Sequence, residues 1–287
     1  MLRLRPLSPF LASALLAACG DGLIEVEQGR ETPGESGRYG LVVLTAQLGE
    51  PGVAISGQLL DYQGITRRNA LLALAAPELA WLAELELSPG TCRLLDSDAS
   101  EPRALARVDL LDAGPLVVRV PDPLDDVQAV PPRELPPLVA ALAGVVYDAA
   151  TPLPYLAGGT YRLDAEGAET GPVTAEIEAP GPVWLEAHTL DDDSLDVRIG
   201  GGPDALVLLS RVGTHPVAAA CRPLEGADAL RVPPEALRHL GGGLTELALI
   251  RLRRSPLHSE GLPGTVLFIT RDATWLTLPD LAEERVR

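Results

Sequence analysis

Short apolar stretches alternate with polar turns from residue 39 to residue 278. Residues 53–59 (VAISGQL) alternate between apolar and polar positions, which is typical of a strand with one buried face. Val183, Leu185 and Ala187 alternate with a mixed set of neighbours over residues 184–188 (Trp, Glu and His) and are predicted to face a core together. Turn residues recur about every ten positions, the spacing of an antiparallel sandwich. The pattern therefore predicts an all-β protein.

Two segments depart from the strand pattern. Residues 233–240 begin with two prolines and are followed by three glycines, which predicts one short helix. Residues 121–137 contain six prolines, a density that disfavours both helix and central strand. We therefore place a domain boundary there and predict two antiparallel β-sandwich-like domains, residues 39–120 and residues 138–280.

Residues 69–87 are ambiguous at this level. Their leucines could line one face of a helix, but Pro77 would interrupt it. We predict a strand and a turn in this segment and leave a short helix open.

The N-terminus has a different character. Arg3 and Arg5 precede an apolar run over residues 7–15, and Leu-Ala-Ala-Cys follows at residues 16–19. The apolar run is too short to cross a bilayer, which needs roughly 20 residues, and has the length of a secretory signal. This arrangement resembles the signal pattern of bacterial lipoproteins.

The resemblance implies that residues 1–18 are removed and that Cys19 carries acyl chains such as palmitate. Several chains would give stable anchoring, since a single chain binds a membrane weakly. An ordinary secretory signal, with Cys19 as an uninvolved thiol, is the alternative. Residues 19–38 are acidic and rich in glycine, and we expect them to form a flexible tether.

The composition of the chain narrows the range of possible binding partners. The chain has 40 acidic and 23 basic residues, a net charge of −17, which argues against nucleic acid as a partner. All the basic residues other than histidine are arginine. This profile resembles that of envelope lipoproteins of GC-rich bacteria whose activity is unknown, and implies a location in the envelope. No functional residue can be assigned from this resemblance. Gly20 and Asp21 follow Cys19, in the region that steers lipoproteins between the two membranes, and lead us to favour the outer membrane.

Aromatic residues make up 3% of the chain, so the core must be built from leucine, valine and alanine. We expect Trp184 and Trp275 to be largely buried, which would leave little aromatic surface for binding sugars. Cys92 and Cys221 lie on opposite sides of the predicted boundary. In an oxidising compartment they could form a disulfide, or each could fill a separate core as a thiol.

The best metal candidate is the acidic run at residues 191–196 (DDDSLD), because clustered carboxylates suit calcium. Leu195 occupies the place of a ligand in the EF-hand pattern, so a solvated turn is favoured and Asp191, Asp193 and Asp196 are weak candidates. The four histidines lack the spacing of a zinc site. No cofactor is predicted.

The chain has neither a G-x-S-x-G motif nor a phosphate-binding glycine loop, and no catalytic residue is predicted. Arg251 and Arg253 share one face of a predicted strand and could bind a carboxylate or a sugar phosphate. Pairing with neighbouring acidic residues on a solvated face is the favoured interpretation.

These observations predict a membrane-anchored lipoprotein without enzymatic activity. Its partners would be the bilayer, through acylated Cys19, and envelope proteins, in a role of binding, scaffolding or adhesion. Strand edges and loops of a sandwich suit such contacts. Two alternatives stay open: a secreted hydrolase whose carboxylates converge only in the fold, and an adhesive module stabilised by calcium.

Overall fold

Strands dominate the computed structural model, and the all-β prediction is confirmed. The structure describes residues 23–26, 35–50, 52–74, 81–83, 85–96, 107–121, 123–124, 126–135, 142–149, 152–191, 193–211 and 217–279.

The helices are α1 (Arg67–Leu74) and α3 (Pro234–Leu240), and residues 81–83 form a further helical turn. In chain order the strands are β1 (Leu23–Val26), β2 (Ser36–Gln47), β3 (Val53–Gln63), β4 (Thr91–Asp96), β5 (Arg107–Leu110), β6 (Leu116–Arg119), β7 (Val127–Val130), β8 (Pro132–Glu134), β9 (Leu142–Asp148), β10 (Thr160–Ala165), β11 (Val173–Glu178), β12 (Trp184–Leu190), β13 (Leu195–Gly200), β14 (Leu206–Arg211), β15 (Val217–Cys221), β16 (Ala229–Val232), β17 (Gly243–Ser259) and β18 (Gly264–Leu278).

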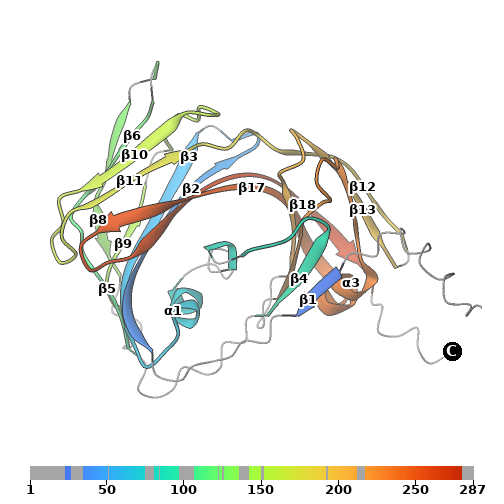
Figure 1. Ribbon diagram of the computed structural model, residues 1–287, viewed down its shortest axis with the longest axis horizontal. Coiled ribbons are helices and arrows are strands. Elements are labelled where there is room, and N and C mark those ends of the chain that lie inside the picture. Colours follow the sequence, from blue (N-terminus) through green and yellow to red (C-terminus); the bar gives the residue numbers. More distant parts are fainter. Residues whose placement is uncertain are drawn as a thin grey trace, which may run out of the picture.

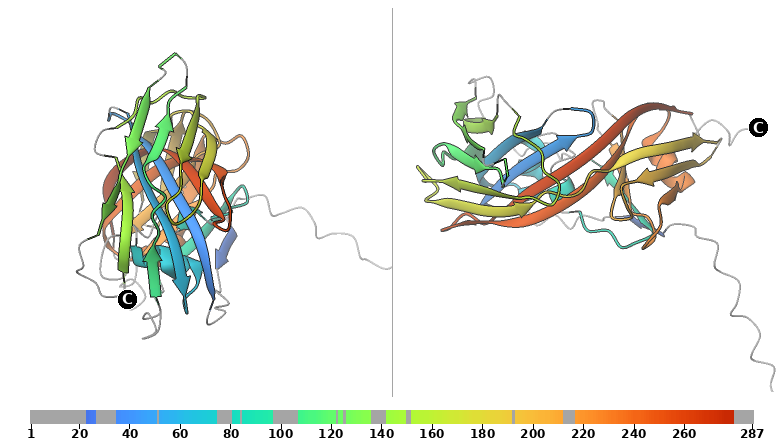
Figure 2. Two further views of the ribbon diagram at one scale, coloured as in Figure 1. Left: turned by 90° about the vertical axis from the view of Figure 1, so that its left-hand side faces the viewer. Right: turned by 90° about the horizontal axis from the view of Figure 1, so that it is seen from above.

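Most of these strands belong to one large mixed sheet. Its main path runs β1-β4-β15-β14-β17-β18-β2-β3-β5-β9-β8, and β11, β10, β6 and β7 extend it from β17. The sheet curves into an arch over α1 (Figure 1), and β17 and β18 run along much of the long axis of the molecule (Figure 2). The strands β12, β13 and β16 form a separate small sheet at one end.

The β17–β18 hairpin contributes to three hydrophobic cores, because successive side chains of a strand point to opposite faces. The concave core lies under the arch, where Leu267 and Ile269 pack with α1 and with Trp81. The tyrosine core lies on the convex side at one end of the hairpin, around Tyr147, Tyr161 and Phe268.

The cysteine core lies on the convex side at the other end of the hairpin. There Leu247 and Leu249 pack with Cys92, with the inward residues of β12, β13 and β16, and with α3. The molecule thus has two sandwich-like ends, and both are built on one shared sheet.

This sharing differs from the two sequential domains expected from the sequence. β2 pairs with β18 and β4 pairs with β15, so strands from before and after residues 121–137 are neighbours in one sheet. The proline-rich segment itself contributes β7 and β8, each of which has a single strand neighbour. Edge positions accept proline because only one side of the strand must donate hydrogen bonds.

The predicted helix over residues 233–240 is confirmed as α3, with Pro233 before it and Gly241 after it. The ambiguous segment forms α1, whose first turn is capped by Thr66: its Oγ1 accepts a hydrogen bond from the Asn69 N–H at 3.2 Å. Pro77 lies outside the described residues. Among the described residues, no helix is long and apolar enough to cross a membrane.

The expected tether also contains a strand. β1 lies parallel to β4, with Leu23 opposite Thr91 and Val26 opposite Leu94. Its sequence, LIEV, is mostly apolar and partly β-branched, which suits pairing along the open edge of β4. The N-terminal segment is therefore attached to the sheet at this point.

Candidate functional site

A groove crosses the outward face of the small sheet, perpendicular to its strands. Its volume is about 380 Å³, within the range of roughly 300–1,000 Å³ that is usual for small-molecule sites. The residues that line it are Ala187, His188, Thr189, Asp196, Val197, Arg198, Ala229, Leu230 and Arg231.

Strand register explains the shape of the groove. One row of outward residues is Ala187–Arg198–Ala229, and a second row is Thr189–Asp196–Arg231. The side chains of the row between them, His188–Val197–Leu230, point to the opposite face of the sheet, so the backbone of this row forms the floor of the groove. Ala187 and Ala229 have short side chains, so Arg198 between them has the single long side chain of the first row.

A β-bulge between Leu185 and Ala187 sets this arrangement. The bulge inserts one residue into β12, so that Trp184, Ala187 and Thr189 point outward although they are not spaced by two. Ala187 was expected to face a core with Val183 and Leu185, and this is wrong because Ala187 is exposed. Periodicity alone does not reveal a bulge.

Trp184 lies beside the groove, on the same outward face, opposite Gly200 of β13 and beyond the row that contains Arg198. The indole occupies the space that a side chain at Gly200 would fill, since a Cβ there would be 2.0 Å from the indole Nε1. It also reaches Gly201, where a Cβ would be 3.1 Å from Cζ3. The ring therefore lies against the glycine backbone, and Trp184 is 39% exposed.

The expectation that Trp184 and Trp275 are largely buried is wrong. Trp275 is 53% exposed, on β18, and Trp81 is the tryptophan that packs into a core. The cysteine core between the small and large sheets is filled by alanine, valine, leucine and isoleucine, so it needs no tryptophan. Composition thus predicted the core residues correctly but misplaced the aromatic side chains.

The charges of the groove are unequally paired. The Arg231 guanidinium donates to Ser194 Oγ at 2.9 Å, and its Nε lies 4.0 Å from Asp196 Oδ1. Arg198 is exposed and makes no ion pair with another described residue. In a chain with a net charge of −17, the groove therefore presents an uncompensated cation.

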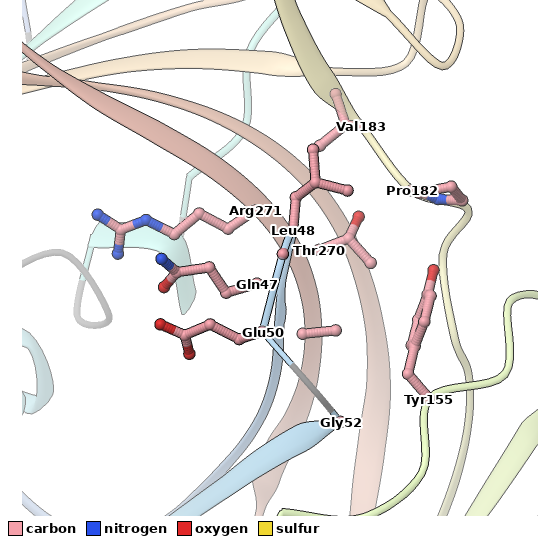
Figure 3. A pocket seen from close by; sticks show the side chains of 11 residues that line it. Gln47, Leu48, Glu50, Gly52, Tyr155, Pro182, Val183, Thr270 and Arg271 are labelled. Atoms are coloured by element: carbon pink, nitrogen blue, oxygen red, sulfur yellow. The ribbon is translucent and has the colours of Figure 1, made fainter.

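A second hollow lies where β2 ends, between the arch and the segment leading to β12 (Figure 3). Its volume is about 140 Å³, below the usual range for small-molecule sites. Tyr155 donates its hydroxyl proton to the Pro180 carbonyl at 2.5 Å, and Thr270 donates to the Gly181 carbonyl at 2.9 Å. Burial raises the pKa of the Tyr155 phenol. These hydroxyls bind the chain itself, so we favour the groove as the site.

Gln47, Glu50 and Arg271 point away from Tyr155, toward the concave side of the sheet (Figure 3). Arg271 forms an ion pair of 2.5 Å with Glu246 on the adjacent strand β17. The guanidinium is therefore engaged by a carboxylate of the protein.

The acidic run forms the turn between β12 and β13. The Asp191 N–H donates to the Ser194 carbonyl at 2.9 Å, while Asp191 and Asp193 are exposed and Asp196 lies beside Arg231. Within the described ranges, no group of three or more histidine, cysteine or acidic side chains could hold a metal ion. Of these three aspartates, only Asp196 lines the groove.

Cys92 and Cys221 form a disulfide, which was one of the two possibilities left open by the sequence. They are opposite residues of β4 and β15, are separated by 129 positions in sequence, and lie fully buried in the cysteine core. Cys19 and the signal segment, residues 1–18, lie outside the described residues.

β17 carries three arginines close together, Arg251, Arg253 and Arg254, and two of them, Arg251 and Arg254, bind backbone carbonyls. Arg251 is buried and donates to the carbonyls of Pro182, Gly201 and Gly202 at 3.1, 2.8 and 3.1 Å. Pairing with acidic residues was expected for it, and the structure shows carbonyl partners because Arg251 lies beneath the loops that flank β12 and β13.

Arg254 donates to two carbonyls of the segment around Trp81, those of Leu82 and Leu85, and burial lowers the pKa of its guanidinium. Arg253 is exposed and makes no ion pair with any residue that the structure describes. The structure therefore does not bring the three arginines together as an anion site.

No protein-family model matches the chain, and no curated protein matches its sequence significantly. The geometry of the groove is therefore the main guide to function. Trp184, beside the groove, and Arg198, within it, were not identified from the sequence as binding residues. The one available signal was the glycine run at residues 200–202 after a strand, which leaves space for a large side chain on the neighbouring strand.

Proposed function

We propose that this protein is a lipid-anchored binding protein of the bacterial envelope, at the outer membrane, and that it acts without catalysis. The Leu-Ala-Ala-Cys sequence at residues 16–19 supports the anchor, with acylated Cys19 as the attachment point. The bilayer is then one partner, and an envelope component that reaches the groove is the other.

The disulfide supports the location outside the cytoplasm. Disulfides persist in oxidising compartments and are rare in the cytosol, where thiols are kept reduced. Cys92 and Cys221 face each other on adjacent strands, in a core that is closed to solvent. Such a bond forms during folding in the compartment where the protein works.

The exposed tryptophan beside the groove is the observation that carries the binding role. Trp184 is large and apolar, yet it lies against a glycine backbone at the surface instead of in the adjacent core. Tryptophan and arginine are the residues most enriched at binding hot spots. Trp184 and Arg198 are neighbours on the same face of the small sheet.

The anchor is tested by metabolic labelling with a palmitate analogue, followed by separation of membranes from soluble fractions. We expect a labelled, membrane-bound product and loss of both properties in Cys19→Ser. The matched control is Cys92→Ala/Cys221→Ala, which retains Cys19 and should keep the label. An unlabelled product in the cytosol or the medium would overturn the proposal.

A further inference from the structure

We infer that the groove of the small sheet binds an oligosaccharide that carries carboxylate groups. Trp184 would stack on a sugar ring, and Arg198 would pair with a carboxylate of the neighbouring unit. The inference rests on the proposed function, because it names the ligand class of the binding role described above.

The stacking role follows from how the indole is held. Gly200 and Gly201 support one side of Trp184, and a side chain at either position would displace the ring. An indole that is already fixed loses little conformational freedom when a ligand covers it. Sugar rings have flat faces of C–H groups, which pack well on an aromatic ring of fixed orientation.

The preference for an acidic ligand follows from charge. The groove is lined by two arginines and one aspartate, and Asp196 is already close to Arg231. Arg198 is left without a carboxylate partner among the described residues, although the chain has 40 acidic residues. A guanidinium binds a carboxylate through two parallel hydrogen bonds, so a uronic acid matches this position.

The spacing favours a chain of sugars over a single one. Gly200, which lies under the indole, and Arg198 are two residues apart on β13 and face outward together, so their backbone positions lie about 7 Å apart. A ligand that touches both Trp184 and Arg198 must extend from the indole into the groove. The groove then offers the Arg231 guanidinium and the Thr189 hydroxyl to the sugar hydroxyls beyond.

A peptide strand is the competing occupant, because β12 is an edge strand of the small sheet. Strand addition would use the backbone groups of β12 and would not require the indole or the Arg198 side chain. The two occupants therefore differ in their dependence on these side chains.

The test uses the full-length lipidated chain in detergent and titration calorimetry with short oligogalacturonates. Neutral cello-oligosaccharides of equal length serve as the comparison ligand. Trp184→Ala and Arg198→Ala should each weaken oligogalacturonate binding at least about tenfold. Added salt should weaken the binding of the acidic ligand and leave the neutral one unchanged.

Two matched variants control for surface effects. Trp275→Ala removes an exposed tryptophan from β18, and Arg253→Ala removes an exposed arginine from β17. Both should bind as the parent does. All four variants change exposed side chains, so their far-UV circular dichroism and melting temperatures should match the parent and exclude unfolding as the cause.

The inference is overturned by oligogalacturonate binding that is undetectable at millimolar ligand, unchanged by both groove variants, or matched by the neutral oligosaccharide. Palmitate labelling of the same preparation reports separately on the anchor. A labelled protein that does not bind the acidic oligosaccharide contradicts this inference alone. An unlabelled protein contradicts the proposed function.

Discussion

The two ends of the arch use aromatic residues in opposite ways. At the tyrosine core, Tyr161 and Tyr155 pack against Phe268 with ring centroids 5.0 and 6.3 Å apart, and the rings form the interior. At the cysteine core the interior contains aliphatic residues and a disulfide, and Trp184 lies outside. One end thus uses its rings for packing, and the other leaves a ring available for a ligand.

The tyrosine core also satisfies its own polar groups. The Tyr161 hydroxyl donates to the Pro154 carbonyl at 2.6 Å and accepts from the Leu156 N–H at 2.9 Å. Tyr147 accepts from the Ala113 N–H at 2.7 Å. The cysteine end is fixed by a covalent bond and by the Arg251 guanidinium instead. The two ends should therefore respond to different perturbations.

The largest expected effect is loss of the disulfide. Cys92→Ala/Cys221→Ala removes a cross-link between residues 129 apart, and we expect the free energy of unfolding in urea to fall by about 4 kcal/mol. Hydrogen exchange should rise first in β4, β15 and α3. A change below about 1 kcal/mol would show that the cysteine core does not depend on the bond.

The next effect comes from Arg251, which connects β17 to the loops flanking β12 and β13. Arg251→Met keeps a long side chain but leaves three carbonyls without their donor, so unfolding in urea should become easier by about 2–3 kcal/mol. Arg253→Met on the same strand is the control, and it should change stability by less than about 0.5 kcal/mol. Equal effects would contradict the role given to Arg251.

Alkaline pH should weaken the tyrosine core selectively. Burial raises the pKa of the Tyr147 and Tyr161 phenols, so the folded state keeps them neutral while the unfolded chain ionises above a pH of about 10. Below that pH, the two tyrosines make their full contribution to the free energy of unfolding. Above it, each tyrosine should lower the free energy of unfolding by about 1.4 kcal/mol per pH unit until its folded-state pKa is reached.

The measurement is urea unfolding between pH 8 and pH 11, with phenolate absorbance as a second observable. Tyr147→Phe should make the pH dependence shallower by one ionisation. A pH dependence that is the same in the parent and in Tyr147→Phe would contradict the assignment.

The smallest effect on stability is expected at Trp184. Since the indole is at the surface, Trp184→Ala should change the free energy of unfolding by no more than about 0.5 kcal/mol. A much larger loss in thermal or urea unfolding would mean that Trp184 contributes to the cysteine core, and the contrast between the two ends would disappear.

Much of the local structure was predictable from the sequence. The prolines before residue 235 and the glycines after residue 240 defined α3, and the alternation of residues 53–59 matched the buried and exposed positions of β3. These features depend on neighbours in the sequence, which is the information that periodicity and capping contain.

The long-range arrangement was not predictable in the same way. That β2 pairs with β18, and that β4 pairs with β15, depends on contacts between distant segments. Proline density marked residues 127–134 as unsuitable for a central strand, which fits their edge positions, but it did not distinguish an edge from a linker. The candidate groove was likewise hidden, because it needs a bulge in β12 and three strands in register.

The place of the β17–β18 hairpin near the C-terminus has a consequence for biogenesis. Its side chains enter all three cores, so none of the cores can be completed before the last strands are available. If the protein is exported as proposed, its folding would stay incomplete until β17 and β18 have crossed the membrane. Dependence on such distant contacts slows folding and prolongs the exposure of apolar strands, which creates a need for chaperones on the far side.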